Sequence, residues 1–178
     1  MAERKIALLR GINVGGHKKI KMADLRQMMD DAGFSTVKTV LASGNVAFDS
    51  DSDNLDELKA TLETQIEARF GFPVPVLVFP KQQITDLIGA DPFEGIDVTK
   101  ATRLYVTFLP TPVTPNIDIP YEAPDGDFRI LRVTDTDVCS VLTVDKTRSG
   151  DGMAILEKEF GKGITTRNWN TVLKIAQL

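Results

Sequence analysis

The sequence is poor in the residue types that build disulfides and cysteine–histidine metal centres. It contains one cysteine, Cys139, and one histidine, His17. A single cysteine cannot form an intrachain disulfide, and a zinc site needs three or four ligands. We therefore expect no metal, and no motif indicates a cofactor. A nucleophilic Cys139–His17 pair is disfavoured, because Cys139 lies in an apolar strand-like run where a thiol is usually buried and inert.

Long apolar runs and an excess of positive charge are missing as well. No run approaches the roughly 18 apolar residues that a membrane helix needs, and residues 1–5 lack the features of a signal peptide. The formal net charge of −4 argues against a protein whose main partner is nucleic acid, since such proteins usually carry a basic balance or a basic face. We expect a cytoplasmic protein without a membrane partner.

The first eighty residues alternate strand and helix patterns in the order β-α-β-β-α-β. This order is that of the ferredoxin-like split β-α-β arrangement, in which four antiparallel strands carry two helices on one face. Pro75 cannot donate to a ladder, so its end of the last strand is expected at a sheet edge or outside the ladder. The expected strands are residues 5–10, 36–42, 46–48 and 73–80, and the helices run from about Met22 to Gly33 and from Leu55 to Gly71.

The second half shows a similar order without its first helix. Residues 110–126 contain five prolines and are therefore expected to form a loop. The predicted fold class is α+β, with two ferredoxin-like halves and antiparallel sheets. The halves are residues 1–80 and 103–178, joined by a helix and loop at 81–102, as two units or as one compact domain. The expected strands of the second half are 104–109, 128–133, 138–144 and 164–166, and the helices are 152–160 and a last one that starts at Asn168.

A glycine-rich basic loop, residues 10–21, joins the first strand to the first helix. Gly11 and Gly16 have the spacing of a phosphate-binding loop, but His17 and Lys18 stand where such a loop needs lysine and then serine or threonine. The sequence therefore excludes a nucleoside triphosphatase with a phosphate-binding loop at these residues. Two interpretations remain: the glycines form only a tight turn, or backbone amides and cations hold a phosphate or carboxylate.

Two further polar turns could contribute to a ligand cleft. The bland interpretation of residues 167–170 is that Asn168 caps the last helix and Trp169 anchors it. The functional interpretation is that polar side chains there and in the turn 43–45 converge with the glycine-rich loop. The predicted ligand-binding residues are Arg10, Gly11, Asn13, Gly15, Gly16, Lys18, Ser43, Asn45, Arg167, Asn168 and Asn170.

Three stretches of the chain resemble the domain-of-unknown-function 1697 family. They are residues 9–16 with 22–25, residues 43–46, and residues 165–172. The resemblance implies a two-part α+β protein of a kind widespread in bacteria, without an established activity or catalytic residues. It also implies a helix where this chain has the proline-rich segment 110–126.

Three functions follow as hypotheses. The first is binding of a small anion, such as a phosphate, nucleotide or carboxylate, at the glycine-rich basic loop, with help from Arg167. The second is a homodimer or other protein-interaction module that uses a sheet face or the edge near residues 73–80. The third is nucleic-acid binding through the basic loop alone.

The spacing Asp49-x-Asp51-x-Asp53 lacks the glycine and glutamate of a calcium loop, so we expect a turn in which Asp53 or Asn54 caps the next helix.

Overall fold

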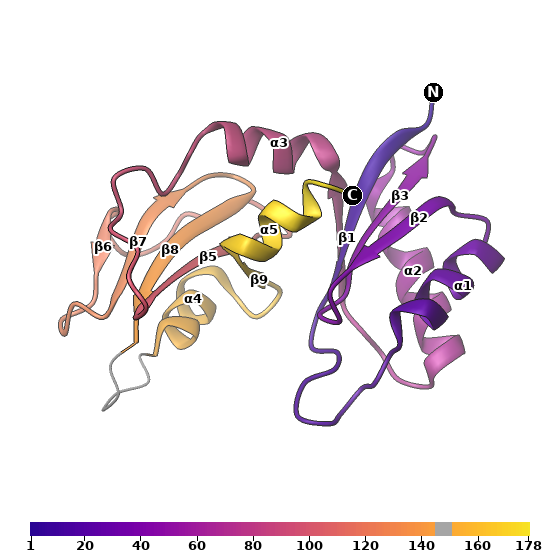
Figure 1. The fold of residues 1–178 in the computed structure, drawn as a ribbon, viewed down its shortest axis with the longest axis horizontal. Coiled ribbons are helices and arrows are strands. Elements are labelled where there is room, and N and C mark those ends of the chain that lie inside the picture. Colours follow the sequence, from indigo (N-terminus) through magenta and orange to yellow (C-terminus); the bar gives the residue numbers. More distant parts are fainter. Residues whose placement is uncertain (145–150) are drawn as a thin grey trace. The chain divides into compact units, whose positions relative to one another are not determined.

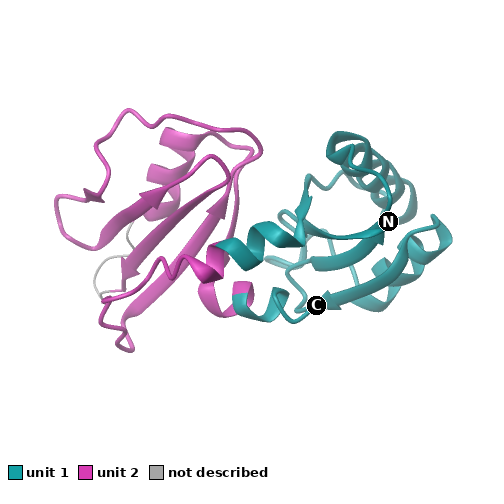
Figure 2. Cartoon of the chain, turned by 90° about the horizontal axis from the view of Figure 1, so that it is seen from above, with its two compact units in different colours: residues 1–86, 173–178 teal, residues 87–172 magenta. Residues whose placement is uncertain are grey.

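The computed structural model, which describes residues 1–144 and 151–178, is an α+β fold with two antiparallel sheets. The chain divides into two compact units (Figure 2): unit 1 contains residues 1–86 and 173–178, and unit 2 contains residues 87–172. Unit 1 is therefore built from both ends of the chain. In the described residues, no helix is long and apolar enough to cross a membrane.

Unit 1 has the element order that the sequence predicts for residues 1–80. Its sheet has the order β2-β3-β1-β4 and every neighbouring pair is antiparallel. Two helices, α1 and α2, lie on one face of this sheet (Figure 1). The strands are β1 (Glu3–Leu9), β2 (Ser35–Val40), β3 (Asn45–Ser50) and β4 (Val76–Pro80), and the helices are α1 (Met22–Asp31), α2 (Leu55–Phe70) and α3 (Lys81–Gly89), of which residues 87–89 belong to unit 2.

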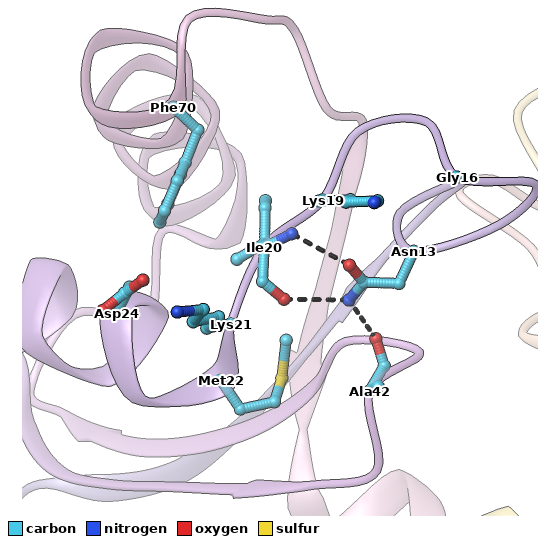
Figure 3. Close-up of a pocket in the computed structure, with 9 residues that line it drawn as sticks. All are labelled: Asn13, Gly16, Lys19, Ile20, Lys21, Met22, Asp24, Ala42 and Phe70. Carbon is cyan, nitrogen blue, oxygen red and sulfur yellow. Dashed lines mark hydrogen bonds between the residues drawn. The ribbon is translucent and has the colours of Figure 1, made fainter.

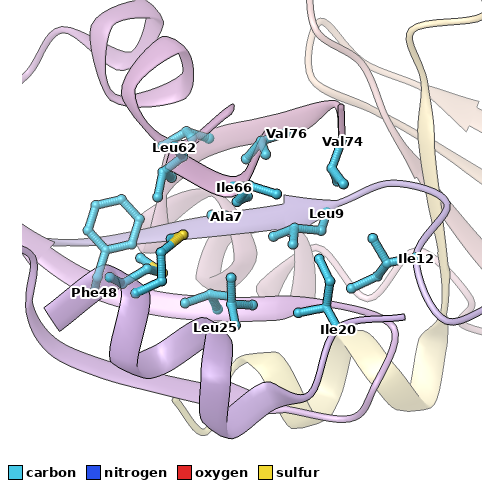
Figure 4. Packing of buried hydrophobic residues seen from close by; sticks show 14 of the residues in the cluster. Ala7, Leu9, Ile12, Ile20, Leu25, Phe48, Leu62, Ile66, Val74 and Val76 are labelled. Carbon is cyan, nitrogen blue, oxygen red and sulfur yellow. The ribbon is translucent and has the colours of Figure 1, made fainter. Parts of the chain in front are cut away.

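The core of unit 1 lies between the sheet and its two helices. Leu62 and Ile66 of α2 and Leu25 of α1 pack with Leu9 of β1 and Phe48 of β3 (Figure 4). The apolar side chains that recur at helical spacing along α2 therefore face the core. The N-terminus of that helix is capped as expected: the Asn54 side chain accepts a hydrogen bond from the Glu57 amide at 3.1 Å.

The proline-bounded strand lies where the sequence places it. β4 pairs with β1 alone and is an edge strand, and Pro75 precedes its first residue. The carboxylate of Glu63 accepts the hydrogen bond of the Val76 amide at 3.0 Å. The start of this edge is therefore blocked by a side chain of unit 1 itself.

One arginine joins the first strand to the last residue of the sequence. The Nη1 atom of Arg4 donates to the Thr36 carbonyl at 2.6 Å and to Asp49 Oδ1 at 3.0 Å. Its Nε and Nη2 atoms donate to the Leu178 carbonyl at 3.2 and 3.0 Å. Hydrogen bonds from Thr36 and Arg4 lower the pKa of Asp49. The C-terminal segment is thereby fixed to unit 1.

Unit 2 contains a sheet of order β6-β7-β8-β5-β9, again antiparallel throughout. Without the two-residue strand β6, which the sequence patterns did not indicate, this order matches that of unit 1 strand for strand. The C-terminal helix begins at Trp169, one residue later than expected, because Asn168 is the last residue of β9. The strands are β5 (Thr102–Phe108), β6 (Tyr121–Glu122), β7 (Phe128–Val133), β8 (Asp137–Thr143) and β9 (Thr165–Asn168), and the helices are α4 (Gly152–Phe160) and α5 (Trp169–Ile175), of which residues 173–175 belong to unit 1.

The proline-rich segment 110–126 contains no helix, as its composition predicts. Three of its side chains, Val113, Ile117 and Ile119, nevertheless pack against the same apolar cluster as Leu156 of α4. Glu159 of α4 accepts a hydrogen bond from the Asn116 amide at 2.9 Å. The segment therefore packs beside α4 without forming the helix that the resemblance implied at these residues.

Gly44, in the turn between β2 and β3, tests how tightly unit 1 is packed. Its φ is +86°, and a Cβ there would lie 2.7 Å from the Leu9 Cβ and 2.9 Å from Ile12 Cδ1. Because backbone strain adds to overpacking, we expect Gly44→Ala to lower the free energy of unfolding by about 2–5 kcal/mol in chemical denaturation. Gly11→Ala is the matched control, with a φ of +71° and no neighbour within 4 Å, and should cost about 1–2 kcal/mol. Equal losses would contradict the packing argument.

Candidate functional site

The glycine-rich loop is a short hairpin that leads into α1. The amide of His17 donates to the Val14 carbonyl at 3.1 Å, and the amide of Asn13 donates to the Lys18 carbonyl at 3.2 Å. Gly15 and Gly16, with φ of +61° and +77°, are the two central residues of the turn. A two-residue hairpin turn of this kind requires positive φ at both positions, so the turn interpretation accounts for both glycines.

Asn13 attaches the hairpin to the rest of unit 1. Its Nδ2 atom donates to the carbonyls of Ile20 and Ala42, at 2.9 and 2.7 Å, and its Oδ1 accepts from the Ile20 amide at 2.9 Å (Figure 3). Lys18 makes a similar long-range contact, with Nζ donating to the Pro73 carbonyl at 2.9 Å. Both side chains predicted to bind a ligand therefore have a structural role in this structure.

The turn 43–45 is likewise stabilised from within. Asn45 is fully buried, and its Nδ2 donates to the Val40 carbonyl at 2.8 Å and to the Ser43 hydroxyl at 2.9 Å. Arg10 is half-buried, and its backbone amide donates to the Pro75 carbonyl at 3.0 Å. These contacts explain the residues as parts of turns and strand ends.

A surface pocket of about 720 Å³ lies beside the hairpin, at the start of α1. Of the predicted ligand-binding residues, Asn13 and Gly16 line it. Its two lysines belong to the basic loop, but most of its wall comes from residues that the sequence patterns did not single out. The lining is Asn13, Gly16, Lys19, Ile20, Lys21, Met22, Asp24, Ala42 and Phe70 (Figure 3).

The lysine charges around this pocket are unfavourable for the start of helix α1. Lys21 occupies the N-cap position of α1 and makes no capping hydrogen bond with its side chain. Lysine is a poor residue at this position, because helix N-termini carry a partial positive charge and unsatisfied amides. Asp24 supplies a negative charge in the first turn. Two lysines and an uncapped helix start therefore face the same pocket, whose apolar wall includes Ile20 and Phe70.

The predicted residues near the C-terminus lie in unit 2. Asn168 caps α5 as expected: its Oδ1 accepts from the Thr171 amide at 2.8 Å and from the Thr171 hydroxyl at 2.9 Å. Trp169 packs edge-to-face against Phe93, with 5.1 Å between the ring centres. Arg167 is half-buried, and burial lowers the pKa of its guanidinium. The cap and anchor interpretation thus describes Asn168 and Trp169, and Asn168 and Asn170 also line a second pocket.

Cys139 is fully buried in β8. Burial, and then the negative charge of Asp137, raise the pKa of its thiol to about 12. At neutral pH this thiol is protonated and inaccessible, which does not suit a nucleophile. Within the described residues, no three histidine, cysteine, aspartate or glutamate side chains are grouped so that they could hold a metal ion.

We expect Cys139 to be unreactive toward Ellman's reagent in the folded protein between pH 7 and pH 9. Because the raised pKa exists only in the folded state, unfolding in guanidinium chloride should expose one equivalent of thiol that reacts at the rate of a free cysteine. Absorbance after addition of the reagent measures both. Rapid labelling of the native protein would contradict the buried, protonated thiol.

The fold is similar to that of a solved structure, a conserved bacterial protein from Streptococcus pneumoniae, with a TM-score of 0.73, 23% sequence identity, and coverage of 99% of this chain and 98% of that chain. No match was found among curated proteins. The model of the family described as "protein of unknown function (DUF1697)" matches residues 2–138. The stretches 9–25 and 43–46 lie within this match, and residues 165–172 lie beyond it. The chain belongs to the DUF1697 family.

Proposed function

We propose that this protein binds a small anionic ligand with an apolar portion in the pocket beside the glycine-rich loop. The observation that supports this most directly is the charge at the start of α1. Lys19 and Lys21 line the same pocket, and Lys21 takes the position where a capping side chain would normally neutralise the helix N-terminus. A bound phosphate or carboxylate would accept hydrogen bonds from backbone amides of the first turn of α1 and offset the charge of both lysines.

The shape of the pocket limits the ligand. Its volume of about 720 Å³ is within the range of small-molecule sites. Ile20, Met22 and Phe70 add apolar groups to its lining (Figure 3). A phosphate ester, a nucleotide or a carboxylate with an apolar body satisfies both parts of the wall, whereas inorganic phosphate uses only the charged part. The ligand would therefore bind more tightly than phosphate alone.

The architecture proposed with this function has two ferredoxin-like halves. The equivalent strand orders β2-β3-β1-β4 and β7-β8-β5-β9 support it. We keep residues 1–80 and 103–178 as the two halves, with 81–102 as the connection, and we propose a bacterial cytoplasmic location. The proposal covers binding only.

The homodimer hypothesis remains a proposal for β4. Its support is the position of β4 at a sheet edge. Pro75 and Pro80 lack an N–H, and Glu63 already accepts the N–H of Val76, so pairing through this edge would use few hydrogen bonds. Light scattering at high concentration separates a dimer from a monomer. Binding of nucleic acid through the basic loop also stays a prediction. It predicts an affinity for nucleic acid that falls steeply as the salt concentration rises.

The anion proposal is tested by amide NMR titration of the labelled protein with phosphate, nucleoside monophosphates and a short oligonucleotide. We expect saturable shifts at Gly16 and at Met22, Ala23 and Asp24, larger for the nucleotides than for phosphate. Absence of saturable shifts there with every compound would overturn the proposal.

Replacing the lysines shows whether charge carries the binding. Lys19→Ala and Lys21→Ala should each weaken binding of the best nucleotide by about two- to fivefold, since each removes one charge near the helix terminus. Lys38→Ala is the matched control, because it removes the same charge from β2, away from the pocket. If Lys38→Ala weakens binding as much as the two loop variants, the ligand responds to net charge and not to the pocket.

A further inference from the structure

The second pocket, in unit 2, has a composition different from the first. It has a volume of about 360 Å³, at the small end of the range for small-molecule sites. It lies where β5 begins, β9 ends and α5 begins. Its polar side chains carry two carboxamides, a guanidinium and a hydroxyl, and it contains the only tryptophan of the sequence. The lining residues are Val98, Thr102, Arg103, Leu104, Asn168, Trp169 and Asn170.

The cap of α5 determines how Asn168 faces this pocket. Its Oδ1 accepts both hydrogen bonds from Thr171, so the carboxamide has one fixed orientation. In a carboxamide the Nδ2 group lies on the opposite side from Oδ1 and offers two donors. Asn168, which also lines the pocket, therefore caps the helix with Oδ1, while the cap leaves the two Nδ2 donors unused.

Arg103 is also held in place without being neutralised. Its Nη1 donates to the carbonyls of Lys100 and Thr102, at 2.7 and 3.0 Å. Among the described residues, no carboxylate forms an ion pair with it. Its other donors and its charge are thus directed to solvent or to a pocket occupant, and guanidinium groups bind adjacent acceptor atoms in a fork geometry.

Trp169 supplies an aromatic wall. Its edge-to-face contact with Phe93, at 5.1 Å and 68°, fixes the indole while leaving it half-exposed in the pocket lining. Val98, which is 61% exposed, and Leu104 add apolar surface. A ring that stacks on or beside the indole would cover apolar groups that otherwise contact water.

We propose that this pocket binds a nucleobase whose edge carries adjacent acceptor atoms, as guanine does with O6 and N7. The guanidinium of Arg103 and the Nδ2 donors of Asn168 recognise the acceptors, and Trp169 receives the ring. Arginine paired with O6 and N7 of guanine is the commonest specific contact of this type. The site is separate from the anion pocket of unit 1 and does not depend on it.

The experiment uses Trp169 as its own reporter in the full chain. Guanosine, which has no phosphate, is titrated while tryptophan fluorescence is followed, with N-acetyltryptophanamide as the control for light absorbed by the nucleoside. We expect saturable quenching by guanosine and about tenfold weaker binding of adenosine, whose edge places a donor where guanine has O6. Quenching that does not saturate, or equal binding of the two nucleosides, would overturn the proposal.

Asn168→Asp separates ligand binding from helix capping. Aspartate keeps the acceptor for Thr171 and is an equally good cap, but it lacks the Nδ2 donors. We expect an unchanged melting temperature and about tenfold weaker guanosine binding, with a similar loss in Arg103→Gln. Lys19→Ala, in the other pocket, should leave guanosine binding unchanged. Full binding by Asn168→Asp and Arg103→Gln would show that the pocket does not recognise the edge of the base.

Discussion

The assembly of unit 1 depends on the hydrogen bonds that the backbone of β1 makes with its two neighbouring strands. β3 pairs with one edge of β1 and β4 with the other. Ile6, Ala7, Leu8 and Leu9 are all buried, so both faces of the strand are covered as well. A strand enclosed on four sides can shift neither its register nor its side chains without breaking the core. The glycine-rich hairpin follows directly after this strand, so the pocket beside it is attached to a strand whose position is fixed by the core.

Sequence patterns predicted the elements of the fold wherever a periodic apolar run decided the structure. The helices α1 and α2 and the strands β1, β3 and β4 of unit 1 are of this kind, whereas β2 has no buried residue and follows from its β-branched residues. Sequence patterns fail to predict burial where a charged residue is buried. Lys5 is 2% exposed within β1, because its long side chain lies in the core while Nζ reaches Glu3 Oε2 at 2.9 Å. The two-residue strand β6 has no period to detect, and only its pairing with β7 defines it.

The candidate site was less predictable than the fold, because its residues act through distant partners. The sequence shows that Asn13 is a polar residue in a glycine-rich loop, but it cannot show that Ala42, 29 positions later, takes its hydrogen bond. Lys18 and Pro73 are 55 positions apart. Phe70 is the last residue of α2 and packs against the core of unit 1, and nothing local to it in the sequence indicates a pocket. The one available signal was Lys21 at a helix start, where a capping residue is expected.

The Arg4 contact with Leu178 has a consequence for how the protein is made. Ribosomes synthesise residues 1–86 first, yet unit 1 also contains residues 173–178, and Arg4 binds the carbonyl of the last of them. The first unit to emerge is therefore the last to be completed, because unit 2 must be synthesised in full before the C-terminal segment exists. Until residue 178 has been synthesised, Arg4 lacks this acceptor, so the contact between β1 and residues 173–178 can form only after unit 2 has been made.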